Sequence, residues 1–398
     1  AGPYRAEKLA LSSNGLVVVC GVNTHDGDNN INNAGKVSSY RRDSLESTTW
    51  TEVPVLSGPW NPYGAGTGVS ISSDGSRILL GANEDSYRGK IHVYEYDSNS
   101  NSYTDIYNEK GAFQNQYLGN LGNIKISPDG NKIVYSKKPD SSNLSTKTQI
   151  IIREYNGTNW TSNTSTIDLD ESTNYYIGGM SDDFNTLYLY IGLTSYDRSF
   201  KIYYYGSGAW INTATIEPAA TTYNSSYGSN NNKGISKNGN YIVYNNTVYK
   251  GSADRTSWSV VGNADIDISN TENTKEYDWH PQINDYGNIL IMSEYDNQGA
   301  IIFVLENNVW IQKSEIENSM NSSSSSFHTI NNNYYIPTIS GTTVTINKAP
   351  YTLVSKTPTI NINDVDTTGN FSTTDISLNA SLRVPGNITI VDNSANNY

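Results

Sequence analysis

Short segments in which apolar and polar residues alternate recur along most of the 398-residue chain. The clearest unit spans residues 68–107, where segments 68–72 and 77–82 flank Asp74-Gly75, and segments 89–96 and 102–107 follow. Alternation with a period of two is typical of β-strands, and Asp-Gly supplies the positive φ angles of a tight hairpin turn. The pattern therefore predicts a unit of four antiparallel strands.

The unit returns with a period of about 50 residues, which indicates a circular or stacked repeat architecture. Four antiparallel strands per repeat make one blade of a propeller. We therefore predict an all-β fold with almost no helix, in which residues 1–356 form a seven-bladed β-propeller of four-stranded antiparallel blades. The turn signal occurs seven times, at Asn14-Gly15, Asp74-Gly75, Asp129-Gly130, Phe184-Asn185, Asn238-Gly239, Tyr286-Gly287 and Asn331-Asn332-Asn333.

A large aromatic residue occupies one place in most of these units, in or next to the predicted outermost strand. The gap between neighbouring blades widens with distance from the propeller axis, so we expect these rings to fill it. The seventh unit is the weakest, because only Tyr351 stands near the expected place. The recurring residues are Trp50, Tyr103, Trp160, Trp210, Trp258 and Trp310.

The repeat pattern of the sequence ends after Lys356. Residues 357–398 contain short alternating segments but no Trp and no compact apolar core of their own. Strands that cannot bury one face alone find cover in another chain or another domain. We therefore predict that residues 357–398 are a β-rich tail through which the chain assembles with a neighbour.

Charge and cysteine content exclude several classes of function. The formal net charge is −13, the sequence pI is about 4.7, and there is no basic run, so nucleic acid is not an expected partner. No apolar segment is long enough to span a bilayer, and the first residues do not resemble a signal peptide. Cys20 is the only cysteine and stands in a buried-strand pattern, which predicts a core thiol.

One segment carries residues suited to sugar binding. Asp278, Trp279 and His280 stand where the innermost strand of the sixth blade should begin, close to the mouth of the central channel. An indole can stack on the apolar face of a sugar while the polar groups bind its hydroxyls. The alternative interpretation is a strand entry at Pro281 with Trp279 packed between blades.

Two further sites are candidates for a metal ion and for glycans. The loop containing Asp26 and Asp28 is rich in oxygen ligands and would suit Ca²⁺, but a solvated loop between two strands is the favoured interpretation; no other cofactor is expected. Asn156, Asn159 and Asn163 are glycosylation sequons crowded into one loop and strand end. Ten such sequons would arise by chance in a chain this rich in Asn, Ser and Thr, so the interpretation rests on their placement.

Two resemblances follow from the repeats. Residues 71–78 (ISSDGSRI) and 126–133 (ISPDGNKI) resemble the Ser-Pro-Asp-Gly hairpins of WD40-like propeller repeats. Gly81-Ala82 and Gly89-Lys90, with the tyrosine-containing strand after them, resemble the FG-GAP blade, although the calcium loops of that family are absent from the other repeats. Both resemblances imply a propeller and leave the activity open.

The tail resembles a narrower group. Residues 375–387 are similar to repeated fibre-like segments in predicted structural proteins of large DNA viruses of algae. That resemblance implies a location on a virion surface or, more generally, outside a cell. It also implies partners among other virion or surface proteins, contacted through the tail, and self-association as a further expectation.

The remaining question is whether the propeller is an enzyme. Sialidase-like propellers use an arginine cluster and Ser-x-Asp-x-Gly boxes, but Ser72-Ser73-Asp74-Gly75 is one residue too tight, and the arginines follow no pattern across blades. We therefore predict a non-enzymatic recognition or structural propeller that binds a glycan or protein receptor, with its 31 tyrosines mostly packed between blades. The alternative is a secreted carbohydrate-active enzyme with acids and Trp279 at the channel mouth, because sequence spacing does not reveal acid pairs brought together by different blades.

Overall fold

A computed structural model gives the fold of this chain, and the described residues contain strands and turns with no helix. The absence of helix from the described residues agrees with the amino-acid composition, which is rich in residues that favour strands and turns. The described residues are 8–22, 35–56 without 46 and 48, 65–82, 88–119 without 115 and 117, 124–137, 148–161, 165–169, 175–191, 200–216, 233–262 without 245 and 246, 280–293, 299–317, 328–352 without 331, 332, 341 and 342, 361–362 and 376–377.

Six sheets of four strands account for most of this structure, and in each sheet the strands pair in chain order, all antiparallel. The first three blades consist of β1 (Lys8–Leu11), β2 (Val17–Val22), β3 (Lys36–Arg41) and β4 (Thr51–Leu56); β5 (Ala65–Ile71), β6 (Arg77–Ala82), β7 (Lys90–Asp97) and β8 (Ser102–Lys110); and β9 (Ile124–Ile126), β10 (Lys132–Lys137), β11 (Gln149–Glu154) and β12 (Ser165–Asp168).

The next three blades repeat this plan further along the chain. They consist of β13 (Tyr175–Met180), β14 (Thr186–Ile191), β15 (Phe200–Gly206) and β16 (Ala209–Ile216); β17 (Lys233–Ile235), β18 (Tyr241–Tyr244), β19 (Thr247–Gly251) and β20 (Trp258–Val261); and β21 (His280–Ile283), β22 (Ile289–Ser293), β23 (Gly299–Glu306) and β24 (Val309–Glu317).

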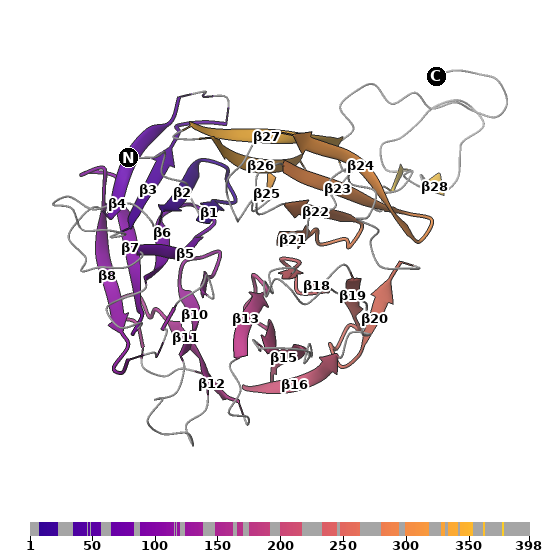
Figure 1. The fold of residues 1–398 in the computed structure, drawn as a ribbon, viewed down its shortest axis with the longest axis horizontal. Coiled ribbons are helices and arrows are strands. Elements are labelled where there is room, and N and C mark those ends of the chain that lie inside the picture. The colour runs from indigo at the N-terminus through magenta and orange to yellow at the C-terminus, as the bar shows by residue number, and fades with distance from the viewer. Residues whose placement is uncertain are drawn as a thin grey trace. The chain divides into compact units, whose positions relative to one another are not determined.

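Successive blades lie side by side through their first strands. The strand β5 contacts β1 and β9, and β17 contacts β13 and β21. Within the unit Ala1–Pro350 the sheets therefore follow one another around a common centre, with the first strand of each sheet innermost (Figure 1). The architecture is a β-propeller, as the repeat pattern predicts.

The seventh blade is described only in part. Its sheet contains β25 (His328–Ile330), β26 (Asn333–Ser340) and β27 (Thr343–Thr352), so three strands are described where four were expected. The hairpin between Ile330 and Asn333 lies at the predicted Asn cluster. The fourth strand was inferred from a repeat whose closing aromatic is missing, and this is the unit in which the pattern is weakest.

The C-terminal residues form a separate unit, Tyr351–Tyr398. Two short strands are described in it, β28 (Asn361–Ile362) and β29 (Ile376–Ser377), and they pair antiparallel with Ile362 opposite Ile376. Short strands were predicted for both places. Most of the tail, including residues 378–398, lies outside the described residues, and its predicted role in assembly stays a prediction.

Five of the six recurring aromatic residues pack between blades, as predicted, whereas Trp50 lies 4.8 Å from the guanidinium of Arg42 in its own blade. Trp210 of the fourth blade packs against a buried cluster that includes Val134, Ile150 and Leu187 of the third and fourth blades. Trp160, Trp258 and Trp310 likewise pack against the blade that precedes their own, and Tyr103 replaces Trp in the second blade. Each of these five rings therefore closes one wedge between neighbouring sheets.

The second strands of the first two blades approach the backbone of the next blade so closely that side chains are excluded there. A Cβ atom on Gly21 would lie 2.5 Å from the carbonyl oxygen of Gly66 in the next blade. A Cβ on Gly81 would overlap the carbonyl oxygen of Gly119. Glycine is therefore required where the first two blades meet their successors.

The single cysteine is a core residue, as predicted. Cys20 lies on β2 and is buried. Burial raises the pKa of its thiol to about 12, and the nearby charge of Glu52 adds to this shift. The thiol therefore stays protonated near neutral pH and acts as a small apolar side chain.

Candidate functional site on the turn face

One end of the propeller carries both sets of short hairpins, and we call it the turn face. The first hairpin of each blade joins its first and second strands at residues 12–16, 72–76, 127–131, 181–185, 236–240 and 284–288. The second hairpin joins the third and fourth strands at the same end, as the Tyr96 N–H to Ser76 carbonyl bond of 2.8 Å illustrates. Most connections at the opposite end fall outside the described residues.

The first hairpins share one internal hydrogen-bond pattern. In the second blade the buried Ser72 Oγ donates to Asp74 Oδ1 at 2.7 Å and accepts from the Arg77 N–H at 2.9 Å. The same carboxylate oxygen accepts the Ser76 N–H at 2.9 Å, and Gly75 adopts φ of +74°. A serine followed two residues later by Asp or Asn therefore fixes each turn through side-chain bonds to its own backbone. The other turns with this pattern begin at Ser12, Ser127, Ser181 and Ser236.

The sixth blade reaches the same result with a different residue. Asn284 stands in the serine position and is buried, and its Oδ1 accepts the N–H groups of Asn288 and Ile289, each at 3.0 Å. The side chain two residues later, which is Asp or Asn in the other turns, is therefore not needed to fix this turn. Tyr286 occupies that position, and 65% of its surface is exposed.

Backbone hydrogen bonds connect neighbouring turns into a chain of contacts. The Ser73 N–H donates to the Pro128 carbonyl at 2.8 Å, linking the second blade to the third. The Asp182 N–H donates to the Lys237 carbonyl at 2.7 Å, linking the fourth to the fifth. Between the third and fourth blades the Nζ of Lys125 donates to Asp182 Oδ1 at 2.7 Å instead. The turn face is therefore held together across blades.

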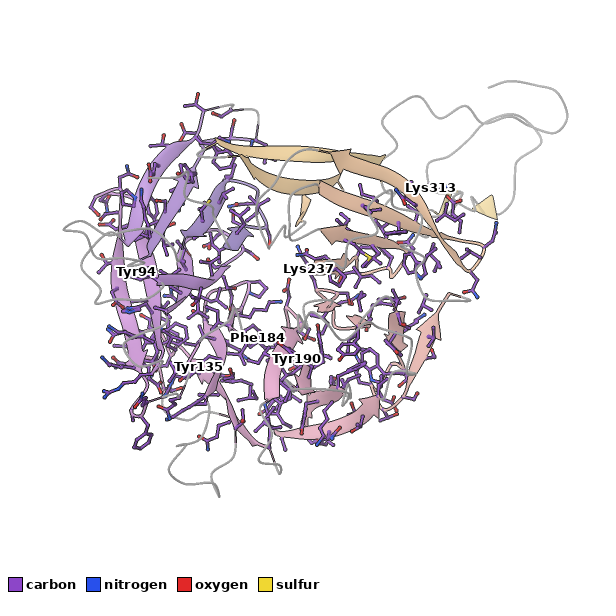
Figure 2. All side chains as sticks on the ribbon, viewed as in Figure 1. Tyr94, Tyr135, Phe184, Tyr190, Lys237 and Lys313 are labelled. Atoms are coloured by element: carbon purple, nitrogen blue, oxygen red, sulfur yellow. The ribbon has the colours of Figure 1, made fainter. Side chains whose placement is uncertain are left out.

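The neighbouring fifth and sixth blades are joined at Asp285, the residue that precedes Tyr286. The Asn238 N–H donates to Asp285 Oδ1 at 2.8 Å, and Asn238 Nδ2 donates to the Asp285 carbonyl at 2.9 Å. Figure 2 shows Lys237, from the fifth-blade turn, at the inner side of the sheets. The exposed Tyr286 ring is therefore carried by a turn whose backbone is fixed on both sides.

Two arginines reinforce this face in an equivalent way. Arg41 of the first blade donates to the Gly75 carbonyl of the second at 3.0 Å, and its guanidinium lies 3.7 Å from the centre of the Tyr96 ring. Arg77 of the second blade donates to the Gly130 carbonyl of the third at 3.2 Å and lies 4.2 Å from the Tyr155 ring. The two arginines come from different strands, β3 and β6, so they reach equivalent turn carbonyls without occupying equivalent positions in their blades.

The turn face is acidic. Its six first hairpins contain five aspartates and one lysine. Burial opposes ionisation of the Asp74 carboxyl, but the hydrogen bonds from the Ser76 N–H and from Ser72 outweigh it and lower its pKa below the ordinary value. The pKa of Asp129 is lowered for the same reasons, burial opposing and hydrogen bonds from Ser127 and Asn131 prevailing. Both groups are therefore anionic near neutral pH and unsuited to proton transfer there.

A second polar cluster lies between the second and third blades. Glu109 Oε2 accepts from the hydroxyls of Tyr135 at 2.6 Å and Tyr107 at 2.9 Å, and from Arg153 Nη2 at 2.6 Å. Burial raises the pKa of Tyr135, and the charge of Glu109 raises it further. The tyrosines therefore stay protonated as donors, and the cluster fastens two blades together. Sequence reasoning missed it because the four residues lie on β8, β10 and β11, with no regular spacing between them.

The residues predicted to bind a sugar or a metal ion lie largely outside the described part of the chain. This applies to Asp278, Trp279, Asp26 and Asp28. His280 begins β21 opposite Ser293, as expected for a strand entry, but its side chain is also outside the described residues. Among the residues that are described, no group of three His, Cys, Asp or Glu side chains is arranged to hold a metal ion.

Two of the three predicted glycosylation sites are described. Asn156 and Asn159 are exposed in the second hairpin of the third blade, whereas Asn163 lies outside the described residues. Asn156 Oδ1 accepts the N–H groups of Thr158 at 3.0 Å and Asn159 at 2.8 Å. In the described part of the chain no helix is long and apolar enough to cross a membrane.

Several solved structures have a fold similar to that of this chain. It is similar to the periplasmic gluconolactonase PpgL of Pseudomonas aeruginosa, with a TM-score of 0.53, 13% identity and coverage of 80% of this chain and 88% of that one. The β-propeller domain of Cps50 (Swd1) from Myceliophteria thermophila gives a TM-score of 0.54 at 11% identity, covering 86% of this chain and 95% of that one. No protein-family model and no curated protein matches the sequence.

A third similar structure is a putative 6-phosphogluconolactonase from Bacteroides fragilis, with a TM-score of 0.51, 15% identity and coverage of 80% and 85%. Identities this low establish the fold and leave activity open. The propeller resemblance drawn from the repeats is confirmed at that level. The three structures described here are neither viral proteins nor FG-GAP proteins by name, so those two resemblances stay predictions.

The prediction that the protein is not an enzyme is wrong. It relied on the architecture and on missing arginine and Asp-box patterns, but propellers of this same fold include a gluconolactonase and a putative 6-phosphogluconolactonase. The fold therefore supports catalysis as readily as binding. The absence of one set of catalytic residues excludes one chemistry and no more.

Proposed function

We propose that the protein is a recognition propeller that binds a protein partner through its turn face. The observation that carries the proposal is Tyr286, which is 65% exposed on a turn fixed by Asn284 and by the bonds between Asn238 and Asp285. A rigid, exposed aromatic side chain with a polar tip loses little conformational entropy on binding. Such residues are frequent anchors of protein interfaces.

The charge of the turn face supports a partner of a particular kind. Asp285 directly precedes Tyr286, the turns of the second to fourth blades carry four more aspartates on the same face, and the whole chain has a net charge of −13. Opposite charge speeds association and selects partners. We therefore propose a partner segment that presents Lys or Arg beside an apolar group able to pack on the Tyr286 ring.

A displayed peptide library selected against the immobilised full-length protein tests this proposal. We expect enrichment of basic peptides whose affinity falls at least about tenfold with Tyr286→Ser, as expected for loss of an interface anchor. Phe113→Ser is the matched control, because Phe113 is 47% exposed and follows the end of β8, at the end of the second blade opposite its hairpins. Equal binding by the wild type and Tyr286→Ser would contradict the proposal.

The surroundings of the protein are part of the same proposal. We propose that it is displayed outside a cell or on a virion, anchored through residues 357–398, on the basis of the fibre-like pattern in residues 375–387. Sedimentation of chains ending at Lys356 and at Tyr398 tests the tail. An identical oligomeric state for the two chains, alone and with the selected partner, would count against an assembly role.

A second candidate function is chemistry on a sugar at the opposite end of the channel. It is supported by the names of two similar propellers and by the sequence of Asp278, Trp279 and His280, which suits a sugar ring. Glycan-array binding and assays of lactone opening and of product release from labelled polysaccharides test it. Turnover lost in Asp278→Asn and kept in Tyr286→Ser would place the activity away from the turn face.

A further inference from the structure

The chain contains three Asn-Gly pairs, and this dipeptide has a chemistry of its own. The backbone nitrogen of the glycine can attack Cγ of the preceding asparagine, so that an N–C bond forms, the Cγ–Nδ2 bond breaks and ammonia leaves. Water then opens the resulting five-membered succinimide to Asp or isoaspartate. The reaction needs no oxidant, reductant or enzyme, and it depends on whether the local backbone lets the two atoms meet.

Two of the pairs are locked in the first hairpins of the turn face. The Gly15 N–H donates to the Ser12 carbonyl, and the Gly239 N–H donates to the Ser236 carbonyl, each at 2.9 Å. The Asn14 and Asn238 side chains are also bound at both ends, since Oδ1 accepts within the turn and Nδ2 donates to the next blade. Attack there requires prior opening of the turn.

The third pair, Asn156-Gly157, stands in a different environment. Both residues are exposed in the hairpin that connects β11 to Trp160, and the Gly157 N–H makes no hydrogen bond within the described part of the chain. Gly157 has φ of +94°, and a Cβ added there would meet no atom within 4 Å. The attacking nitrogen is therefore free of the bonds that hold Gly15 and Gly239.

The amide of Asn156 is also held in a way that favours attack. Its Oδ1 accepts the N–H groups of Thr158 and Asn159, and this oxygen takes up negative charge when Gly157 attacks Cγ. Two preorganised N–H donors stabilise such an oxyanion. The leaving group, Nδ2, has no hydrogen bond within the described part of the chain.

We propose that Asn156 is a spontaneous deamidation site of the folded protein, and that Asn14 and Asn238 are protected. Conversion adds one negative charge and abolishes the sequon Asn156-Gly157-Thr158. The isoaspartate product also lengthens the backbone of this hairpin by one atom, beside the bridge between Tyr155 and Trp160. Formation of isoaspartate at this site would therefore disturb the packing of Trp160 between the second and third blades.

Peptide mapping by mass spectrometry tests the proposal on full-length protein from a host without N-glycosylation. During incubation at mildly alkaline pH, we expect Asp and isoaspartate at position 156 to form at least about tenfold faster than at positions 14 and 238, because protected sites react only through local opening. In concentrated urea the three rates should converge. Comparable rates at all three sites in the folded protein, or an intact Asn156, would overturn the proposal.

Asn156→Gln provides the matched variant, because glutamine cannot close the five-membered ring but keeps the amide. It should remove the product at this site and leave the slow rates at positions 14 and 238 unchanged. Asn159, which is exposed in the same hairpin but precedes Trp160, serves as an internal control and should stay intact. Equal conversion of Asn159 and Asn156 would show that exposure alone, rather than the Gly157 backbone, governs the reaction.

Discussion

Replacing Glu109 with glutamine tests whether the buried cluster between the second and third blades stabilises the propeller. Glu109 and Arg153 are 20% and 18% exposed, and the carboxylate accepts from two tyrosines as well as from the guanidinium. Glu109→Gln removes the negative charge and leaves Arg153 without its counter-ion in a largely dry site. We expect a loss of about 3 kcal/mol in the free energy of unfolding, as for other buried pairs that lose one partner.

The second blade offers a matched control. Glu95 pairs with Arg77 at 2.7 Å, but its side chain is 42% exposed, so Glu95→Gln should cost less than about 1 kcal/mol. Urea unfolding of both variants measures the difference, with an unchanged m-value as the sign that the unfolded state is the same. The reasoning is refuted if Glu109→Gln destabilises the protein no more than Glu95→Gln.

The Glu109 prediction also has a pH dependence with a definite sign. Burial raises the pKa of Glu109, but the hydrogen bonds from Tyr135 and the charge of Arg153 outweigh it, so the folded-state pKa lies below the ordinary value. Stability from such a group is fully present above the glutamate pKa of the unfolded chain, about 4.3, and is lost as pH falls through the folded value. The stability difference between the wild type and Glu109→Gln should therefore shrink below about pH 4. A difference that grows on acidification would contradict this assignment.

Three further predictions follow. Ser72→Ala should lower the free energy of unfolding by about 1–2 kcal/mol, measured in urea, because it removes a buried hydroxyl with two hydrogen-bond partners. Ser72→Asn should lower it less, because Asn284 makes the corresponding bonds in the sixth blade. Trp310→Phe should lower the free energy of unfolding by about 1 kcal/mol more than Trp210→Phe. Trp310 Nε1 donates to the Val261 carbonyl at 3.1 Å, whereas Trp210 Nε1 has no partner among the described residues. Equal losses of stability in the two variants would contradict this reasoning. Cys20, whose burial raises its thiol pKa to about 12, should resist thiol reagents at mildly alkaline pH until the protein is unfolded, as a colorimetric thiol assay would report.

The fold was predictable because its determinants are local and repeated. Strands such as Arg77–Ala82 and Tyr241–Tyr244 begin and end where alternation and turn residues place them. The recurring Trp marks the blade interfaces because the same wedge must be filled each time. The pattern is weakest at the seventh blade, where the marker residue is absent and three strands, β25 to β27, lie within the described residues.

The candidate site was far less predictable. In the sequence, Tyr286 is only one half of a predicted turn signal. Its exposure depends on Asn284, which accepts the backbone N–H groups that a serine and an aspartate accept in other turns. The links from Arg41 and Arg77 to the next blade join residues more than 30 positions apart. Such contacts depend on how blades are rotated against one another, which the spacing of residues along the chain does not encode.

The outer strands have a consequence for how the protein behaves at high concentration. One extra residue interrupts the pairing of β4, β8, β16 and β24 with their neighbours, and β12 and β20 contain only four residues each. An interrupted or very short edge is a poor template for a strand from another molecule. Copies crowded on a surface would therefore remain separate at these six edges, and any lattice they build must be joined through other parts of the molecule.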